Sequence, residues 1–168
     1  MVVDSFATNT DHDDEVTFAG PYLTVRRDLL IRADDKDGIL SVDDLDGKTV
    51  CTAKGSISGS DMRNLTDKMT VEERDTYPQC VTALMIGEAD AIISDDVILT
   101  GLAADRGGGY LKVVGEPFDE QSYGIAVRNG KSELVGQIDA ALKAMVADGS
   151  WSSAVQALKQ DIGYTVDV

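Results

Sequence analysis

Short apolar segments alternate with segments of helical character along most of this 168-residue chain. We predict strands over residues 22–32, 49–53, 91–94, 111–114 and 124–127. We predict helices over residues 59–68, 79–88, 96–104, 132–147 and 153–160, and a short helical turn over residues 41–45. Alternating strands and helices are typical of an α/β protein whose sheet is largely parallel.

Three further segments carry weaker signals. Gly20-Pro21-Tyr22 precedes the first predicted strand, and we expect a stiff turn there because proline fixes its own φ and restricts the residue before it. Residues 1–13 are polar and are expected to form a loop or a sheet edge. Residues 77–78 are expected to end a short strand.

The chain is strongly acidic. It carries 30 Asp and Glu against 15 Lys and Arg, which gives a formal net charge of −15. Nucleic acids and anionic membrane surfaces attract basic proteins, so this charge argues against either as a partner. Hydrophobic residues make up 43% of the chain, enough for one core or two small lobes.

The sequence predicts no membrane-spanning helix, because it has no run of 18 apolar residues. No secretory signal is visible after Met1. We therefore expect a mature or trimmed fragment that meets a membrane only through an anchor or a partner outside these residues. The two cysteines, Cys51 and Cys80, fit either one disulfide or two buried thiols, and with a single histidine they predict no metal site.

Residues 54–58 (Lys-Gly-Ser-Ile-Ser) connect a predicted strand to a predicted helix. Such a loop directs backbone N–H groups and the positive end of a helix dipole toward an anion. The hydroxyl groups of Ser56 and Ser58 add hydrogen-bond donors. The alternative is that Ser58 or Ser60 only caps the helix.

Asp95 follows the apolar run 91–93. A carboxylate at the C-terminal end of a strand in an α/β sheet faces the crevice in which ligands bind, and it suits an ammonium group. The alternative is that Asp95 or Asp96 only caps the next helix. We expect Asp96 to be the cap and Asp95 to be the ligand contact.

Four segments in succession carry a resemblance to a known family. They are DEVTFAGPYLTVRRDLLIR at 14–32, DLDGKTVCTAKGSISGSDM at 44–62, CVTALMIGEADAIISDDVIL at 80–99 and YGIAV at 123–127. Over nearly its whole length the chain resembles the bacterial family 3 extracellular solute-binding proteins, which bind polar amino acids for ABC importers. The pattern Tyr-x-x-Cys-Val-x-Ala-Leu at 77–84 resembles the actinobacterial glutamate-binding members.

The resemblance implies an α/β fold of the periplasmic binding protein-like type II class, with two lobes joined by crossing strands. It assigns residues 1–32 to part of lobe one, 33–118 to lobe two, and 119–168 to the return into lobe one with the C-terminal helices. The family's first half of lobe one has no counterpart here, so the chain is either a fragment or a protein with a naturally reduced lobe one. Cys51 and Cys80 resemble the disulfide of the actinobacterial relatives.

The resemblance also implies a set of ligand-binding residues: Ser5, His12, Ala53, Ser56, Ile57, Ser58 and Asp95. In the family the loop at 54–58 holds the α-carboxylate of the amino acid, and the aspartate at 95 takes its α-amino group. His12 falls where the family has a clamping arginine, and Ser5 where it usually has a threonine. Because histidine lacks the permanent charge and planar fork of arginine, we expect weak amino acid binding or a different ligand.

We therefore expect an extracellular, cell-surface-associated protein, held by a lipid anchor or a membrane tether. It would capture a glutamate- or glutamine-like amino acid for an ABC permease, without a cofactor. The alternative is a ligand-sensing domain of the same fold with a signalling partner. An enzyme such as a dehydratase is not expected, because the sequence has no recognisable Ser-His-Asp or Cys-His arrangement.

Overall fold

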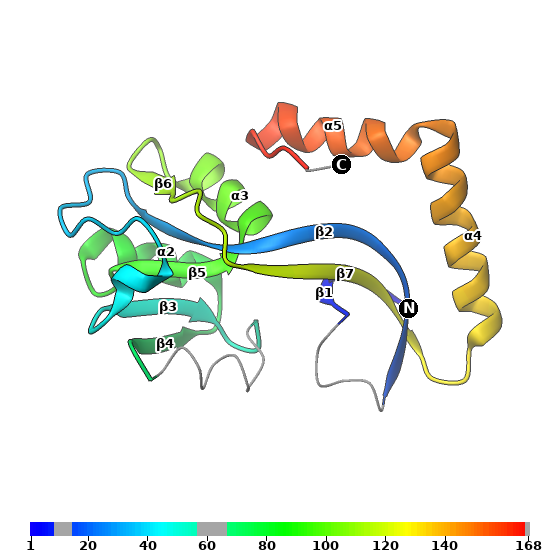
Figure 1. Ribbon diagram of the computed structural model, residues 1–168, viewed down its shortest axis with the longest axis horizontal. Coiled ribbons are helices and arrows are strands. Elements are labelled where there is room, and N and C mark those ends of the chain that lie inside the picture. Colours follow the sequence, from blue (N-terminus) through cyan, green and yellow to red (C-terminus); the bar gives the residue numbers. More distant parts are fainter. Residues whose placement is uncertain (9–14, 57–66, 167–168) are drawn as a thin grey trace. The chain divides into compact units, whose positions relative to one another are not determined.

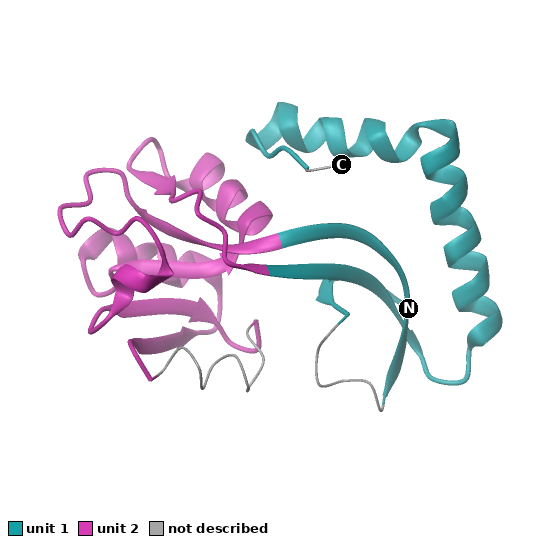
Figure 2. Ribbon diagram, in the orientation of Figure 1, with its two compact units in different colours: residues 1–25, 120–168 teal, residues 26–119 magenta. Residues whose placement is uncertain are grey.

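The computed structural model describes residues 1–8, 15–56 and 67–166 (Figure 1). The chain divides into two compact units, which Figure 2 distinguishes by colour. Unit 1 comprises residues 1–25 and 120–168, and unit 2 comprises residues 26–119. Two strands carry the chain from one unit to the other, β2 (Val16–Arg32) and β7 (Asp119–Arg128).

The sheet of unit 2 is mixed. Its strand order is β2-β5-β3-β4, with β3 (Thr49–Ala53), β4 (Thr70–Arg74) and β5 (Ala91–Asp95), and β6 (Leu111–Val113) also pairs with β2. β3 is parallel to both β4 and β5, whereas β2 is antiparallel to β5 and β6. The prediction of a largely parallel sheet therefore holds only around β3, whose two parallel neighbours, β4 and β5, are connected to each other by α2.

The helical elements of unit 2 are the short 3-10 helix η1 (Val42–Leu45), α2 (Tyr77–Ile86) and α3 (Asp96–Arg106). The expected strand end at 77–78 is wrong, because α2 begins at Tyr77. Pro78 lies in the first turn of α2, where backbone N–H groups have no partner within the helix, so proline costs no hydrogen bond there. β4 was not predicted, since three of its five residues are charged and its only apolar residue is Val71. The helix predicted over 59–68 lies mostly outside the described residues.

Two buried clusters form the core of unit 2. Consecutive residues point to opposite faces of a strand, so Leu30 and Ile92 join one cluster while Leu29 and Ile93 join the other. The first cluster includes Leu84 of α2 and Leu99 of α3. It also includes the predicted disulfide between Cys51 and Cys80, which is confirmed, with Cα atoms 5.5 Å apart.

In unit 1, β7 lies between β1 (Val2–Ala7) and β2, and the chain ends with α4 (Ser132–Asp148) and α5 (Ser150–Ile162). Both helices are wholly within the described residues, and neither buries a side chain fully. Each is joined to β2 by a hydrogen bond of 2.9 Å. Asp139 Oδ1 accepts from the Gly20 N–H, and Trp151 Nε1 donates to the Tyr22 carbonyl.

The expected turn at Gly20-Pro21-Tyr22 is wrong, because β2 runs through these residues with a cis Gly20–Pro21 bond. Gly20 has φ +108, a conformation that favours glycine. A Cβ added there would lie 2.9 Å from the Tyr22 backbone nitrogen. Local chain stiffness at proline therefore did not stop the strand.

Candidate functional site

The ends of β3 and β5 bring two predicted site segments to one edge of the unit 2 sheet. The two strands are parallel neighbours, with Cys51 opposite Ile92. β3 leads into the loop that contains Ser56, and β5 ends at Asp95. This is the carboxyl edge of the parallel strands, where ligands bind in α/β sheets.

Thr52 links the two segments directly. Its side chain is fully buried, and its Oγ1 lies 2.7 Å from the Ser56 hydroxyl oxygen and 3.2 Å from the Ile93 carbonyl oxygen. The Thr52 hydroxyl has one proton, so it donates to one of these two oxygens at a time. Ile93 is two residues before Asp95. Sequence reasoning placed Thr52 in a strand without assigning it a role, although a hydroxyl at the buried end of a strand was an available signal.

The Ser56 loop is closed by its own hydrogen bonds. The Ser56 N–H donates to the Ala53 carbonyl at 3.1 Å, and the Ser56 hydroxyl donates to the same oxygen at 2.7 Å. Gly55 has φ +75, which lets the chain turn sharply between them. A ligand anion that binds the Ser56 hydroxyl must therefore replace the Ala53 carbonyl as its partner.

Of the four other predicted contacts, Ser5 is the one that falls within the described residues. Ser5 lies in β1 of unit 1, is exposed, and donates its N–H to Asp4 Oδ1 at 2.8 Å. His12, Ile57 and Ser58 lie outside the described residues. Within unit 2, the structure brings together Ala53, Ser56 and Asp95.

Asp95 and Asp96 differ in their positions at the start of α3. Asp95 occupies the N-cap position and is half-buried, so the expectation that Asp96 is the cap is wrong. The strand conformation persists through Asp95, with φ −72 and ψ 141, and the helix starts one residue later. Asp96 Oδ1 accepts from the Val97 N–H at 2.8 Å and from the Arg26 N–H at 3.2 Å.

Asp75, at the end of β4, is a third acidic residue at this edge and was missed because β4 was missed. It forms an exposed ion pair of 2.7 Å with Lys54 Nζ. The hydrogen bond to Asp75 and its charge raise the pKa of Lys54, and the same contacts lower the pKa of Asp75. Lys54 is also held through its backbone N–H, which donates to the Arg74 carbonyl at 2.9 Å.

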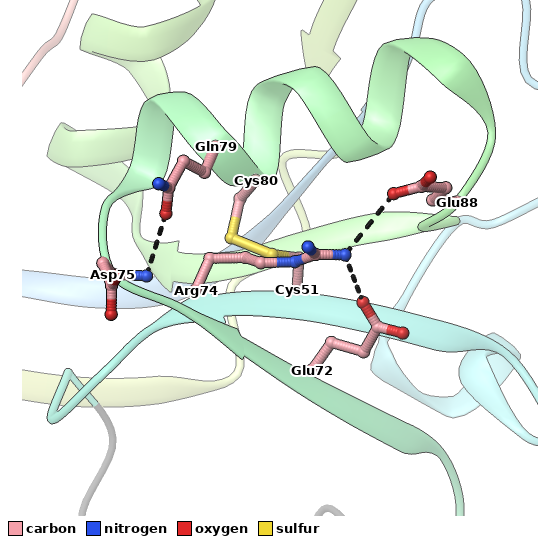
Figure 3. A network of polar contacts seen from close by, with 7 residues as sticks. All are labelled: Cys51, Glu72, Arg74, Asp75, Gln79, Cys80 and Glu88. Carbon is pink, nitrogen blue, oxygen red and sulfur yellow. Dashed lines mark hydrogen bonds and ion pairs between the residues drawn. A yellow bond between two sulfur atoms is a disulfide. The ribbon is translucent and has the colours of Figure 1, made fainter.

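A groove of about 410 Å³ lies next to this edge, and side chains at the end of β4 and from α2 line it. Figure 3 shows the polar contacts in this region. It is lined by Lys54, Glu73, Arg74, Asp75, Gln79, Thr82, Ala83 and Glu88. The Arg74 guanidinium contacts Glu72 at 2.8 Å and Glu88 at 3.4 Å. Because carboxylates outnumber cations along it and both cations contact them, the groove is a poor site for an anion.

Over residues 1–8, 15–56 and 67–166, no group of three or more His, Cys, Asp or Glu side chains is placed to hold a metal ion. In the same part of the chain, no helix combines the length and the apolar character that crossing a membrane requires.

Comparisons with known proteins agree with this geometry. The chain is 37% identical over 156 residues to the glutamate-binding protein GluB of Corynebacterium efficiens, covering 90% of this chain and 53% of the relative. It is 35% identical over 151 residues to the ABC transporter glutamine-binding protein GlnH of Bacillus subtilis, covering 89% of this chain and 54% of the relative. It thus spans about half the length of these two relatives.

A solved structure is also similar. The GluR0 ligand-binding core from Nostoc punctiforme, in complex with L-glutamate, matches with a TM-score of 0.79 and 27% identity, over 96% of this chain and 72% of that one. The expected fold class is therefore confirmed. The sequence model of the family "bacterial extracellular solute-binding proteins, family 3" matches residues 1–158, and the chain belongs to that family.

Proposed function

We propose that this chain is the ligand-binding part of a protein that captures a glutamate- or glutamine-like amino acid for an ABC importer, without catalysis. One observation carries the proposal: Thr52 holds the Ser56 loop against β5, two residues before Asp95. A hydroxyl-bearing loop and a carboxylate thus stand at one sheet edge, and they match the two charged ends of an α-amino acid. The names of the relatives from C. efficiens and B. subtilis support the same ligand class.

The proposed roles follow from charge. Asp95 accepts hydrogen bonds from the α-ammonium group, since such charge-assisted bonds are roughly twice as strong as neutral ones. Ser56, with Ala53, Ile57 and Ser58 of the same segment, receives the α-carboxylate. Ser5 and His12 are further proposed ligand contacts, with His12 in place of the family's arginine.

We further propose that unit 1 contains part of lobe one and that unit 2 is lobe two. On this proposal the protein acts outside the cell, held at the surface by an anchor or tether, and an ABC permease is its partner. The family's description as extracellular supports the location. The glutamine-binding relative from B. subtilis, named as an ABC transporter protein, supports the partner.

Calorimetric titration of the chain with L-glutamate and L-glutamine tests the proposal. Asp95→Asn and Ser56→Ala should each weaken binding by about tenfold or more, because each loses a hydrogen bond to a charged group. Asp90→Asn is the matched control: Asp90 accepts from the Thr49 N–H at 2.9 Å, at the opposite edge of the same strands. Titrations without heat for either amino acid, or an unchanged affinity in Asp95→Asn, would overturn the proposal.

His12→Arg tests the departure from the family pattern separately. Arginine should strengthen binding of the ligand carboxylate, because it offers a permanent charge and a bidentate fork. An unchanged dissociation constant would remove His12 from the proposed site.

A further inference from the structure

At the start of unit 2, three consecutive residues of β2 connect this strand to its neighbours, and we call their contacts the β2 brace. These residues are Arg26, Arg27 and Asp28. The Arg26 N–H donates to Asp96 Oδ1 at 3.2 Å, at the first turn of α3. The Arg27 carbonyl accepts from the Phe118 N–H at 3.0 Å, and its guanidinium pairs with Asp119 at 3.1 Å. β2 is therefore fastened both to α3 and to the segment 114–119 that leads out of the unit.

The side chain of Asp28 makes the remaining hydrogen bonds of the β2 brace. Its carboxylate accepts from the Gly115 N–H at 3.0 Å and from the Leu29 N–H at 2.6 Å. In the next ladder step, the Val114 N–H donates to the Leu29 carbonyl at 2.9 Å. Asp28 thus extends the contact between β2 and the outgoing segment by one further backbone N–H.

This brace lies directly opposite the proposed ligand contact. In the antiparallel pair of β2 and β5, Arg27 is opposite Asp95 and Asp28 is opposite Ser94. The ladder step that carries Asp95 is therefore enclosed between the Arg26 bond to α3 and the Asp28 bond to Gly115. A shift of β2 at this point would move Asp95 as well.

Asp28 is an unfavourable residue for stability alone. Its side chain is nearly inaccessible to solvent, at 2% exposure, and desolvation raises its pKa despite the bonds from Leu29 and Gly115. The nearby charges of Asp96 at the start of α3 and Glu116 of the outgoing segment raise the pKa further. A buried carboxylate kept among like charges suggests a role other than stability.

We propose that Asp28 is a positioning residue for the ligand-binding edge, which fixes the placement of Asp95 by tying Gly115 to β2. The proposal rests on the proposed function, because it takes Asp95 as the ligand contact.

The first test needs no ligand. In Asp28→Asn, amide hydrogen exchange at Gly115 and at residues 95–97 should become about tenfold faster, as expected from the weakening of a bond to a charged group. Asp90→Asn should leave these amides unchanged, since Asp90 bonds at the far edge of the sheet. Unchanged exchange at residues 95–97 in Asp28→Asn would overturn the proposal.

The second test compares affinity with stability. Asp28→Asn should bind L-glutamate about tenfold more weakly, while its urea midpoint stays at or above that of the native chain, because a costly buried charge is gone. Equal loss of affinity in Asp28→Asn and Asp90→Asn would indicate a general structural effect and overturn the proposal. If Asp28→Asn does not fold, Asp28→Ser serves in the same measurements.

The two proposals fail separately. A native chain that binds neither L-glutamate nor L-glutamine overturns the proposed function, and the exchange measurement still decides whether Asp28 positions Asp95.

Discussion

Unit 2 and unit 1 differ in how much of their own surface they bury. Both buried clusters and the disulfide lie within residues 26–119. In unit 1 the strands bury side chains such as Tyr123 and Val127, yet α4 and α5, which are described throughout, bury none fully. The comparison shows that a regular helix need not contribute to a buried core: α2 and α3 of unit 2 do so, whereas α4 and α5 of unit 1 have no fully buried side chain.

The difference follows from the residues of each unit. The central strands of unit 2 are apolar on both faces, as in Leu29-Leu30-Ile31 and Ile92-Ile93, so helices and loops cover both sides. In unit 1, Leu134, Met145 and Val146 of α4 remain exposed. At about 25 cal/mol per Å² of buried apolar surface, fully buried helix residues such as Leu84 and Leu99 stabilise unit 2 more than the exposed residues of α4 stabilise unit 1.

The largest expected effect is in the core of unit 2. Leu84→Ala should lower the free energy of unfolding of unit 2 by about 3–5 kcal/mol, because Leu84 of α2 is fully buried in the first cluster. Leu134→Ala in α4, whose side chain is 36% exposed, should cost less than about 1 kcal/mol. Urea unfolding followed by amide exchange measures both, and equal losses would erase the contrast between the units.

The disulfide should contribute nearly as much. Its cysteines are 29 residues apart, so on the chain-entropy estimate its loss should destabilise unit 2 by about 3–4 kcal/mol. The double variant Cys51→Ala/Cys80→Ala, compared with the native chain in urea, measures this. Trp151, the only tryptophan, lies in unit 1 and reports on that unit by fluorescence. Because both cysteines lie in unit 2, we expect the fluorescence transition of unit 1 to shift less than the unfolding transition of unit 2, and an equal shift would contradict this expectation.

Gly124→Ala addresses unit 1. A Cβ at Gly124 would lie 2.6 Å from Thr8 Cγ2 and 3.0 Å from Phe18 Cδ1, so these side chains or the backbone that carries them must shift. We expect a loss of about 1–3 kcal/mol, the usual range for overpacking. Gly136→Ala in α4 is the control, since its Cβ meets nothing within 4 Å and alanine favours a helix by about 1 kcal/mol. Destabilisation by both variants would indicate that α4 is more closely packed than its exposure implies.

The smallest expected effect is a change in how the free energy of unfolding of unit 2 depends on pH. Because the folded pKa of Asp28 is raised, its contribution to the stability of unit 2 is present below its ordinary pKa of 3.8 and is lost as pH rises through the folded value. Asp28→Asn removes this dependence. The native chain should therefore lose stability relative to the variant between low and neutral pH. Asp35, Asp44 and Asp75, whose pKa values are lowered, act in the opposite direction and cancel in that difference.

Sequence reasoning was accurate where pattern and burial coincide. The strand over 49–53 has the predicted bounds, and the helix predicted over 79–88 is α2, which begins and ends two residues earlier than predicted. It failed at β4, whose Thr-Val-Glu-Glu-Arg sequence has no apolar alternation, and at Gly20-Pro21, which lies inside a strand. In both places pairing with neighbouring strands overrides local preference.

The sequence by itself determined the α/β class and the two segments around Ser56 and Asp95, because these depend on residue type and local order. Its resemblance to a known family supplied the family and the pairing of Cys51 with Cys80. Only the tertiary structure decided that Thr52 joins those segments, that Asp75 stands beside Lys54, and that Asp28 braces the strand opposite Asp95. Apart from the contact between Thr52 and Ser56, which are four positions apart, these hydrogen bonds join residues 21 to 87 positions apart. Which strands become neighbours in a sheet depends on the packing of the whole core, and no local sequence pattern determines it.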